Sequence, residues 1–212
     1  MYLAGLLASQ SVTRIAGSEG AWFSGDSVIL FEGFATARLV LREAVVEDAA
    51  AIYDGYASDP EVTRFLSFPT HRDVGDAERF LALCAEERAA GRSNTYVVTR
   101  RGDQVVLGVF DLRVEARFRL GFGYALGRAH WGRGYMSEVL GEVVRWAGTR
   151  PEVWRLWAFC DAENAASARV MVKAGLGFEG VLRRWFVHPN IGPEPRDCLA
   201  FAWVAGGLTG KR

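Results

Sequence analysis

Residues 130–138 read His-Trp-Gly-Arg-Gly-Tyr-Met-Ser-Glu, and most of the fold can be worked out from this stretch. Gly132 and Gly134 remove Cβ atoms where the backbone has to turn sharply and approach a ligand closely. A helix pattern follows at once, and the first N–H groups of a helix have no partner inside it. Because such a helix end attracts anions, the stretch predicts a phosphate-binding loop that opens a helix.

Hydrophobic spacing differs on the two sides of this loop. Upstream, hydrophobic residues occupy every second position, as in a strand: Phe118, Leu120, Phe122, Tyr124 and Leu126. Downstream they recur at steps of three and four, as on one face of a helix: Met136, Val139, Leu140, Val143, Val144 and Ala147. The chain is therefore expected to run strand, glycine loop, helix.

Two other phosphate loops share this order, and the sequence argues against both. A nucleoside triphosphatase loop needs Lys and then Ser or Thr after its second glycine, whereas residues 127–134 offer Arg133 and Gly134 there. The glycines within 121–127 are spaced one residue too long for a dinucleotide fingerprint, and no βαβ unit precedes them. A tight turn between strand and helix that binds nothing stays open from this motif alone.

Length and charge limit the classes of function. The 212 residues suffice for one domain, or one domain with an extension, and half of them are hydrophobic, which is enough for a sizeable core. Lys plus Arg and Asp plus Glu number 25 each, so the formal net charge is zero. Nothing in this balance favours nucleic acid or an anionic membrane as the main partner.

Cysteine usage and hydropathy indicate the compartment. Cys84, Cys160 and Cys198 are odd in number, far apart and set in apolar surroundings, which predicts buried thiols in a reducing environment. The three His are equally dispersed, so we expect no metal. Residues 1–8 are apolar but few, and no later run approaches the ~20 apolar residues of a membrane span. We expect a soluble, cytoplasmic protein.

The expected organisation is an extension over 1–36, a domain over 37–206 and a tail over 207–212. Within the extension, residues 21–31 are compatible with a hairpin closed by Ser24-Gly25-Asp26. The domain should begin with a strand over 38–43 and a helix over 47–56. A short helical piece then runs from Pro60 to Phe65, and a capping box at Thr70 and Asp73 opens a helix that ends at Gly91.

The remaining elements alternate between strands and helices. Two strands over 96–100 and 104–112 are joined by the turn Arg101-Gly102-Asp103, and a connection over 113–116 leads to the strand over 117–126, which gives an antiparallel meander. After the loop and its helix come a strand over 154–159, a helix over 164–174 and a closing hairpin of 180–187 with 198–204. The strand 154–159 should lie parallel to 117–126, because a helix connects them.

A second group of polar residues follows the strand over 154–159. Asn164 is well placed as a helix N-cap, and Ser167 lies one turn further on, so their polar groups face the same helix end. Taken alone, this is a capped surface helix. Together with Lys173-Ala-Gly175 and Glu179-Gly-Val-Leu-Arg183, however, it follows the glycine loop at a defined distance.

The two motifs together resemble the GNAT superfamily of acyltransferases. Gly132, Arg133 and Gly134 match the core of the acetyl-CoA loop [QR]-x-x-G-x-[GA], with Ala129 in place of Gln or Arg. The run from Asn164 resembles the N-x-x-S…K-x-G-F-x-x-E-G-x-x-R signature of the ribosomal-protein N-terminal acetyltransferases, the Rim-type group, with Leu in place of Phe at 176. The resemblance spans roughly 39–204.

The resemblance implies an α+β fold with a mixed sheet, in which an antiparallel meander leads to two central parallel strands that splay apart between flanking helices. It implies acetyl-CoA as cosubstrate and no metal. The pantetheine arm would add to the open strand edge near 124–126, and the pyrophosphate would lie on N–H groups of 132–137. The implied cofactor-binding residues are Tyr124, Ala125, Leu126, Trp131, Gly132, Arg133, Gly134, Tyr135, Met136, Ser137, Asn164, Ser167 and Arg169.

Catalysis would be direct attack of a neutral primary amine on the thioester carbonyl. The N–H of Leu126 is the candidate oxyanion donor, and Ser167 the candidate proton donor to the leaving thiolate, because the Tyr found in many relatives seven residues after the Asn is Met171 here. The usual Glu bases are missing: one is replaced within Gly121-Phe-Gly-Tyr124 and the other by Phe186. The candidates that remain are His188, Asp111, Glu115 and Asp197; for His188 a structural role is the competing interpretation.

The implied function is an N-acetyltransferase that acts on a primary amine, either a protein N-terminal α-amine or a small molecule, as a monomer or homodimer. One alternative is a catalytically inactive module that binds or senses acyl-CoA, which the missing Glu would suit. A second is an unrelated α+β binding domain, if the later motif is coincidental. CoA binding and turnover with amines separate the three.

Overall fold

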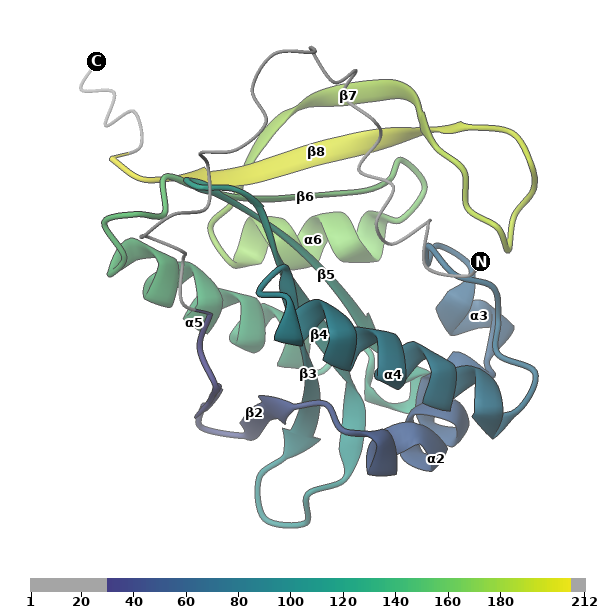
Figure 1. Cartoon of the computed structure of the whole chain (residues 1–212). Helices are drawn as coiled ribbons and strands as arrows, with labels where there is room; N and C mark the ends of the chain where they lie inside the picture. The colour runs from purple at the N-terminus through teal and green to yellow at the C-terminus, as the bar shows by residue number, and fades with distance from the viewer. Residues whose placement is uncertain (1–29, 207–212) are drawn as a thin grey trace.

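The computed structural model describes residues 30–206, and these form one mixed sheet covered by helices on both faces (Figure 1). The 8 strands are ordered β1-β2-β3-β4-β5-β6-β8-β7, and every neighbouring pair is antiparallel except β5 with β6. The strands are β1 (Gly33–Ala35), β2 (Leu39–Glu43), β3 (Ser93–Arg100), β4 (Val106–Ala116), β5 (Arg119–Leu126), β6 (Arg155–Asp161), β7 (Gly177–Phe186) and β8 (Arg196–Val204).

The helices fall before β3 and after β5 and β6. A 3₁₀ turn η1 (Val46–Asp48), α2 (Ala49–Ile52) and a π-helical turn η2 (Tyr53–Ala57) follow one another directly. The others are α3 (Pro60–Thr63), α4 (Val74–Ala89), the 3₁₀ turn η3 (Arg128–His130), α5 (Tyr135–Gly148) and α6 (Ala165–Lys173). In the part of the chain that the structure describes, no helix has the length and apolar character needed to cross a membrane.

Most expected elements are present, and the mixed sheet with its parallel pair of central strands is confirmed. The predicted hairpin over 21–31 lies outside the described residues except for its last two, as does the tail over 207–212. Residues 33–35 of the expected extension form β1, which pairs with β2 in the same sheet. Cys84, Cys160 and Cys198 are free and buried, as expected.

Two expectations about local structure are wrong. Thr70 does not cap a helix; the N-cap of α4 is Asp73, whose side chain accepts from the Asp76 N–H. Thr70 instead bonds to Asn190, which lies far away in sequence, so a tertiary contact has displaced the local cap. The residues over 113–116 are not a connection but the end of β4, because β5 continues to pair with them.

Two cores lie on opposite faces of the sheet. One face carries Val97, Val109 and Ala125, which pack with residues of α2 and α4. The other carries alternate residues of the same strands, including Tyr96, Phe110, Phe122 and Leu120, which pack with the buried face of α5 and with Met171 of α6. This division follows from the alternation of side chains along a strand between the two faces of the sheet.

The sheet opens between its two halves. β5 and β6 pair only through Arg119–Arg155, Leu120–Leu156 and Gly121–Trp157. Beyond these pairs, β5 continues to 126 beside β4, and β6 continues to 161 beside β8. Figure 1 shows β3, β4 and β5 running in a different direction from β6 and β8. A gap therefore widens towards the glycine loop, as the resemblance implied.

Candidate active site

The glycine loop has the backbone conformation that only glycine adopts readily. Gly132 has φ of 73° and Gly134 has φ of 76°, both left-handed, and Gly134 is the N-cap of α5. A Cβ built on Gly132 would have no heavy atom of the described residues within 4 Å, and one on Gly134 would come only as near as 3.7 Å to Arg38 Nη2. Backbone conformation, rather than crowding by the protein, is therefore what requires glycine here.

Arg38, which precedes β2, contacts both the glycine loop and the first turn of α5. Its Nη1 donates to the Arg133 carbonyl at 3.0 Å, its Nε donates to Glu138 Oε2 at 2.6 Å, and its guanidinium lies 4.7 Å from the ring centre of Tyr135. Burial alone would raise the pKa of Glu138, but hydrogen bonds from Thr36 and Arg38 bring this pKa below its usual value. Arg38 therefore bridges the loop, through the Arg133 carbonyl, and the first turn of α5, through Glu138.

The edge of β5 that faces the gap is open. The Gly127 N–H donates to the Leu107 carbonyl of β4 at 2.8 Å. Peptide groups alternate along an antiparallel strand, so those of Leu126 and Tyr124 point away from β4, into the gap. Of these groups, the Leu126 carbonyl accepts a hydrogen bond from the indole Nε1 of Trp131 at 2.6 Å. Trp131 therefore lies across the loop end of the open edge.

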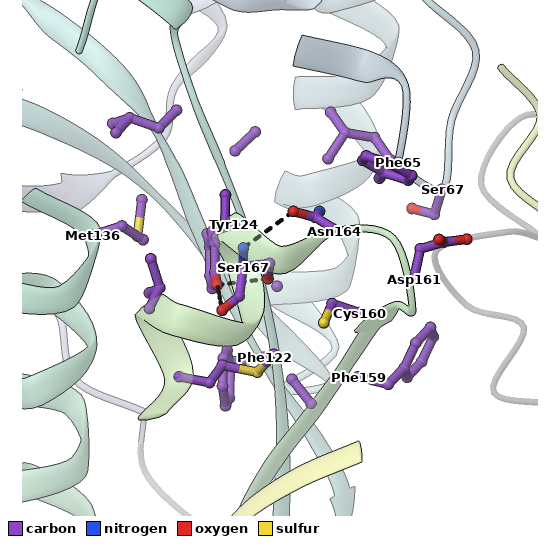
Figure 2. A pocket seen from close by; sticks show the side chains of 18 of the residues that line it. Phe65, Ser67, Phe122, Tyr124, Met136, Phe159, Cys160, Asp161, Asn164 and Ser167 are labelled. Carbon is purple, nitrogen blue, oxygen red and sulfur yellow. Dashed lines mark hydrogen bonds between the residues drawn. The ribbon is translucent and has the colours of Figure 1, made fainter. Parts of the chain in front are cut away.

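A polar cluster joins β5 to the start of α6 (Figure 2). The Tyr124 phenol and the Ser167 hydroxyl are 2.8 Å apart, and the Asn164 side chain accepts from the Ser167 N–H at 3.1 Å. Burial raises the pKa of Tyr124 well above its usual value, and burial raises the pKa of the nearby Cys160 thiol to about 11. The cluster is uncharged at neutral pH, so its hydroxyl groups are protonated and can act as hydrogen-bond donors.

These features share one cavity of about 660 Å³, which passes through the gap in the sheet. Figure 2 shows Tyr124 and Ser167 between Met136 on one side and Phe65 on the other. Every residue expected to bind the cofactor lines this cavity except Arg133. Of the three catalytic candidates, Leu126 and Ser167 lie beside the gap, whereas His188 lines the part of the cavity next to Phe65.

His188 follows β7 and is almost fully buried, at 3% exposure. Its Nε2 lies 3.4 Å from Asp161 Oδ2, and neither ring nitrogen has a hydrogen-bond partner among the residues that the structure describes. Burial lowers the pKa of His188, and the Asp161 carboxylate opposes this only in part. Asp161 is itself held by Arg196, whose Nε donates to Oδ2 at 2.6 Å. His188 is therefore neutral at pH 7.

The structure distinguishes among the other carboxylate candidates. Asp197 lies outside the cavity, bound to Arg183 at 2.9 Å. Asp111 and Glu115 of β4 both line the cavity. Burial raises the pKa of Asp111, although Arg113 and the Thr95 hydroxyl act in the opposite direction.

Two features escaped the sequence reasoning. The first is the hydrogen bond that joins the Tyr124 phenol to Ser167; strand alternation places Tyr124 on the side of α6 and would have been the signal. The second is a group of aromatic rings on β6 and β7 that line the cavity. The sequence alone does not show that these rings lie together, because they come from two strands that are not neighbours in the chain. They are Trp157 and Phe159 of β6 with Trp185 and Phe186 of β7.

Comparison with known proteins identifies the family. The family model for the acetyltransferase (GNAT) domain matches residues 38–177. The chain belongs to the GNAT acetyltransferase family. A curated relative, the uncharacterized N-acetyltransferase p20 of Bacillus licheniformis, is 30% identical over 150 residues, which cover 70% of this chain and 84% of p20. As a GNAT member, the chain is an N-acetyltransferase.

Solved structures of other GNAT proteins share the fold. The Microcin C7 self immunity acetyltransferase MccE, solved with acetyl-CoA and AMP, superposes with a TM-score of 0.72 at 16% identity, covering 80% of this chain and 93% of that chain. RimL, a ribosomal L7/L12 alpha-N-protein acetyltransferase solved with CoA, gives a TM-score of 0.68 at 17% identity, covering 80% and 96%. Identities this low show the fold alone.

Proposed function

We propose that this GNAT enzyme transfers the acetyl group of acetyl-CoA to a primary amine, a protein N-terminal α-amine or a small-molecule amine, by direct attack. One observation carries the proposal: the left-handed glycine loop, the open edge of β5 and the hydroxyl cluster of Tyr124 and Ser167 all line one cavity. The cavity therefore provides, in order, a glycine loop for a phosphate group, an open strand edge for an extended amide arm and hydroxyl groups for a thiol.

The cofactor side of this path uses three sets of groups. The N–H groups of 132–137, at the start of α5, suit the pyrophosphate, and Arg169 adds a positive charge to the cavity wall. The peptide groups of 124–126 that point into the gap suit an arm that binds as an added strand. Asn164 and Ser167 flank the thioester end. Acetyl-CoA, when bound, supplies the activated acyl group.

Two groups of the chain would act during transfer. As the amine nitrogen bonds to the carbonyl carbon, the N–H of Leu126 would donate to the oxyanion, a contribution that can be worth about 3 kcal/mol. When the carbon–sulfur bond breaks, the Ser167 hydroxyl would give its proton to the thiolate and recover one from the Tyr124 phenol, 2.8 Å away. The attacking nitrogen loses one proton to solvent and the Tyr124 phenolate regains one from solvent, so the proton count balances and Tyr124 is restored.

The proton of the amine has no dedicated carboxylate acceptor on β5, where Gly121 and Gly123 stand. His188 is the alternative acceptor: it is neutral at pH 7, lines the cavity and lies next to Asp161. A base with the lowered pKa of His188 would produce an acidic limb in the pH profile below pH ~6.5. The profile therefore decides between His188 and an acceptor that binds already neutral.

Two measurements test this function. Release of free CoA thiol from acetyl-CoA across a panel of amines reports turnover, and calorimetric titration with CoA reports binding. We expect both, and we expect Gly134→Val to weaken CoA binding several-fold because a β-branched side chain disfavours the left-handed conformation of Gly134. Tight CoA binding without turnover of any amine would favour the acyl-CoA-sensing alternative. Mass spectrometry of a cell extract incubated with labelled acetyl-CoA would then identify the natural acceptor.

A further inference from the structure

The face of the cavity opposite the hydroxyl cluster of Tyr124 and Ser167 includes a β-bulge in β4. Where β4 pairs with β5, Val114 lies opposite Leu120 and Ala116 opposite Arg119, so Glu115 is an extra residue in the ladder. A β-bulge redirects the side chain of such a residue, and bulges are frequent beside active sites. The bulge here sends the Glu115 carboxylate across β5.

Gly121 makes room for this carboxylate. A Cβ on Gly121 would lie 2.3 Å from Glu115 Oε1, so any side chain there would expel Glu115. The Trp157 indole donates to Glu115 Oε2 at 2.5 Å, and Arg119 Nε lies 3.2 Å from the same oxygen. The Glu115 side chain is 14% exposed, whereas that of Arg119 is 41% exposed, so the arginine approaches from the surface and the carboxylate lies inside.

An aromatic wall leads away from Glu115. Trp157, which holds the carboxylate, is 6.2 Å from Phe159 between ring centres. Phe159 in turn contacts Trp185 at 6.2 Å and Phe186 at 5.3 Å, all lining the cavity. Figure 2 shows Phe159 on the same side of Ser167 as Phe65. The wall ends at His188, whose ring nitrogens have no hydrogen-bond partner in residues 30–206.

The wall combines aromatic rings with the carboxylate of Glu115. The rings present faces that attract cations, and Glu115 presents a carboxylate at one end. Asp161, another acid beside the wall, is enclosed with Arg196 and is 1% exposed, whereas the arginine partner of Glu115, Arg119, is 41% exposed and contacts only Oε2. A ligand with an ammonium group and a flat apolar ring can therefore contact both the Glu115 carboxylate and the aromatic wall. A compact polar amine can contact only the carboxylate.

We propose that Glu115, Trp157, Phe159 and Trp185 form the acceptor subsite, and that it selects a primary ammonium group carried one or two carbons from an aromatic ring. The subsite deepens the proposed function and rests on it. The same chemistry is presented by a free arylalkylamine and by a peptide whose first residue is aromatic. Binding at Glu115 holds the ammonium on the face of the sheet opposite the hydroxyl cluster. The ammonium gives its proton to solvent water before the neutral amine attacks.

The test compares phenethylamine, a tripeptide amide beginning with Phe, and ethanolamine as the compact control. Each amine is titrated by calorimetry into CoA-loaded protein, and kcat/KM is measured for each with acetyl-CoA. Glu115→Gln keeps an oxygen for the Trp157 indole, and Phe159→Leu keeps most of the volume. Glu179→Gln and Phe178→Leu are matched controls, because both residues lie on β7 outside the cavity, Glu179 paired with Arg155.

We expect phenethylamine or the peptide to bind at least tenfold more tightly than ethanolamine. Phe159→Leu should narrow that preference about three- to tenfold, the range that ring contacts support. Glu115→Gln should weaken all three amines at least tenfold, chiefly in KM, and leave CoA affinity within twofold. A circular dichroism spectrum and a CoA affinity like those of the unmodified protein establish that the variants fold. Preference for the peptide over phenethylamine would assign the subsite to protein N-termini.

Equal binding of ethanolamine, or an effect of Glu115→Gln no larger than that of Glu179→Gln, overturns the subsite even if amines are acetylated. Tight aromatic amine binding that depends on Glu115, without acetyl transfer, would leave the subsite standing and overturn the proposed function instead. The binding and turnover readouts thus separate the two proposals.

Discussion

Replacing Gly132 with Ala isolates the contribution of backbone conformation to cofactor binding. Gly132 has φ of 73°, and an added Cβ would meet no described heavy atom within 4 Å, so only the left-handed conformation opposes alanine. That conformation costs a residue other than glycine about 1–2 kcal/mol. In the free Gly132→Ala protein the loop would relax to avoid this cost, and its N–H groups would turn away from the phosphate position. CoA can then bind only if the loop returns to the left-handed conformation, so the cost is subtracted from the binding free energy.

The expected loss in CoA affinity follows from that cost. Since about 1.4 kcal/mol corresponds to a factor of ten, Gly132→Ala should weaken CoA binding about 5- to 30-fold in a calorimetric titration. Gly132→Asn should lose less, because Asn tolerates the left-handed region better than Ala does. Gly91→Ala is the matched control: Gly91 has φ of 66°, equally free space, and a position after α4 outside the cavity.

The control separates binding from stability. Gly91→Ala should lower the melting temperature by a few degrees, since about 1 kcal/mol shifts it by roughly 2–4 °C in a domain of this size. Gly132→Ala should lower it less, because the relaxed loop of the free protein escapes part of that cost. Only Gly132→Ala should lose CoA affinity. An affinity of Gly132→Ala within twofold of the unmodified protein, or an equal loss in Gly91→Ala, would refute the reasoning that the loop is preorganised for phosphate.

Three further predictions concern chemistry and stability. Ser167→Ala should lower kcat much more than it weakens CoA binding, and Tyr124→Phe should do the same to a smaller degree; an unchanged kcat, with product release shown not to limit, removes Ser167 from the mechanism. The kcat/KM profile should rise with pH to the pKa of the acceptor amine without a separate acidic limb, and His188→Ala should not alter its shape; a limb that disappears in His188→Ala makes His188 the base. Arg196→Met should cost about 3 kcal/mol in urea denaturation at pH 7, because it leaves the buried Asp161 carboxylate without its partner, whereas Arg183→Met at an exposed pair should change little.

The last of these predictions has a defined pH dependence. Burial alone would raise the pKa of Asp161, but the bonds from Arg196 bring it below its usual value. Its contribution to stability is therefore present above the pKa of the unfolded group, near ~3.9, and is lost as pH falls through the lower folded value. In Arg196→Met the unpaired carboxylate protonates more readily, so the gap to the unmodified protein should narrow between pH 7 and pH 5. A gap that stays constant contradicts the assignment.

Local sequence signals predicted the parts of the fold that local chemistry determines. Alternation over 118–126, the two glycines and the spacing of three and four after Met136 are backbone preferences, and β5, the loop and α5 follow them closely. Asn164 is likewise the N-cap of α6, because a side-chain acceptor three residues before an open N–H needs no distant partner. The sequence also placed the candidate cofactor residues on one cavity, apart from Arg133.

The rest depended on contacts that are distant in sequence. Thr70 gave a convincing local cap, yet its N–H and hydroxyl bond to Asn190. The end of β4 was expected to be a connection, although Leu112, Val114 and Ala116 alternate there with the charged Arg113 and Glu115. The Glu115 carboxylate lies where a Cβ of Gly121 would be, and the Arg113 guanidinium lies beside Gly123, contacts between strands that single-strand patterns do not show.

The formal neutrality of the chain conceals a division of charge within the cavity. Arg169 and Lys173 reach it from α6, on the side of the sheet where the cofactor phosphates are proposed to enter. Asp111 and Glu115 reach it from β4, on the opposite face, Asp111 with Arg113 at 2.6 Å and Glu115 with Arg119 at 3.2 Å. An anionic cosubstrate and a cationic acceptor would thus approach from opposite faces of the sheet and meet in the gap between β5 and β6. Salt would weaken the binding of the anionic cosubstrate at one face and of the cationic acceptor at the other. A chain with a net charge of zero can thus bind two ligands of opposite charge at one site.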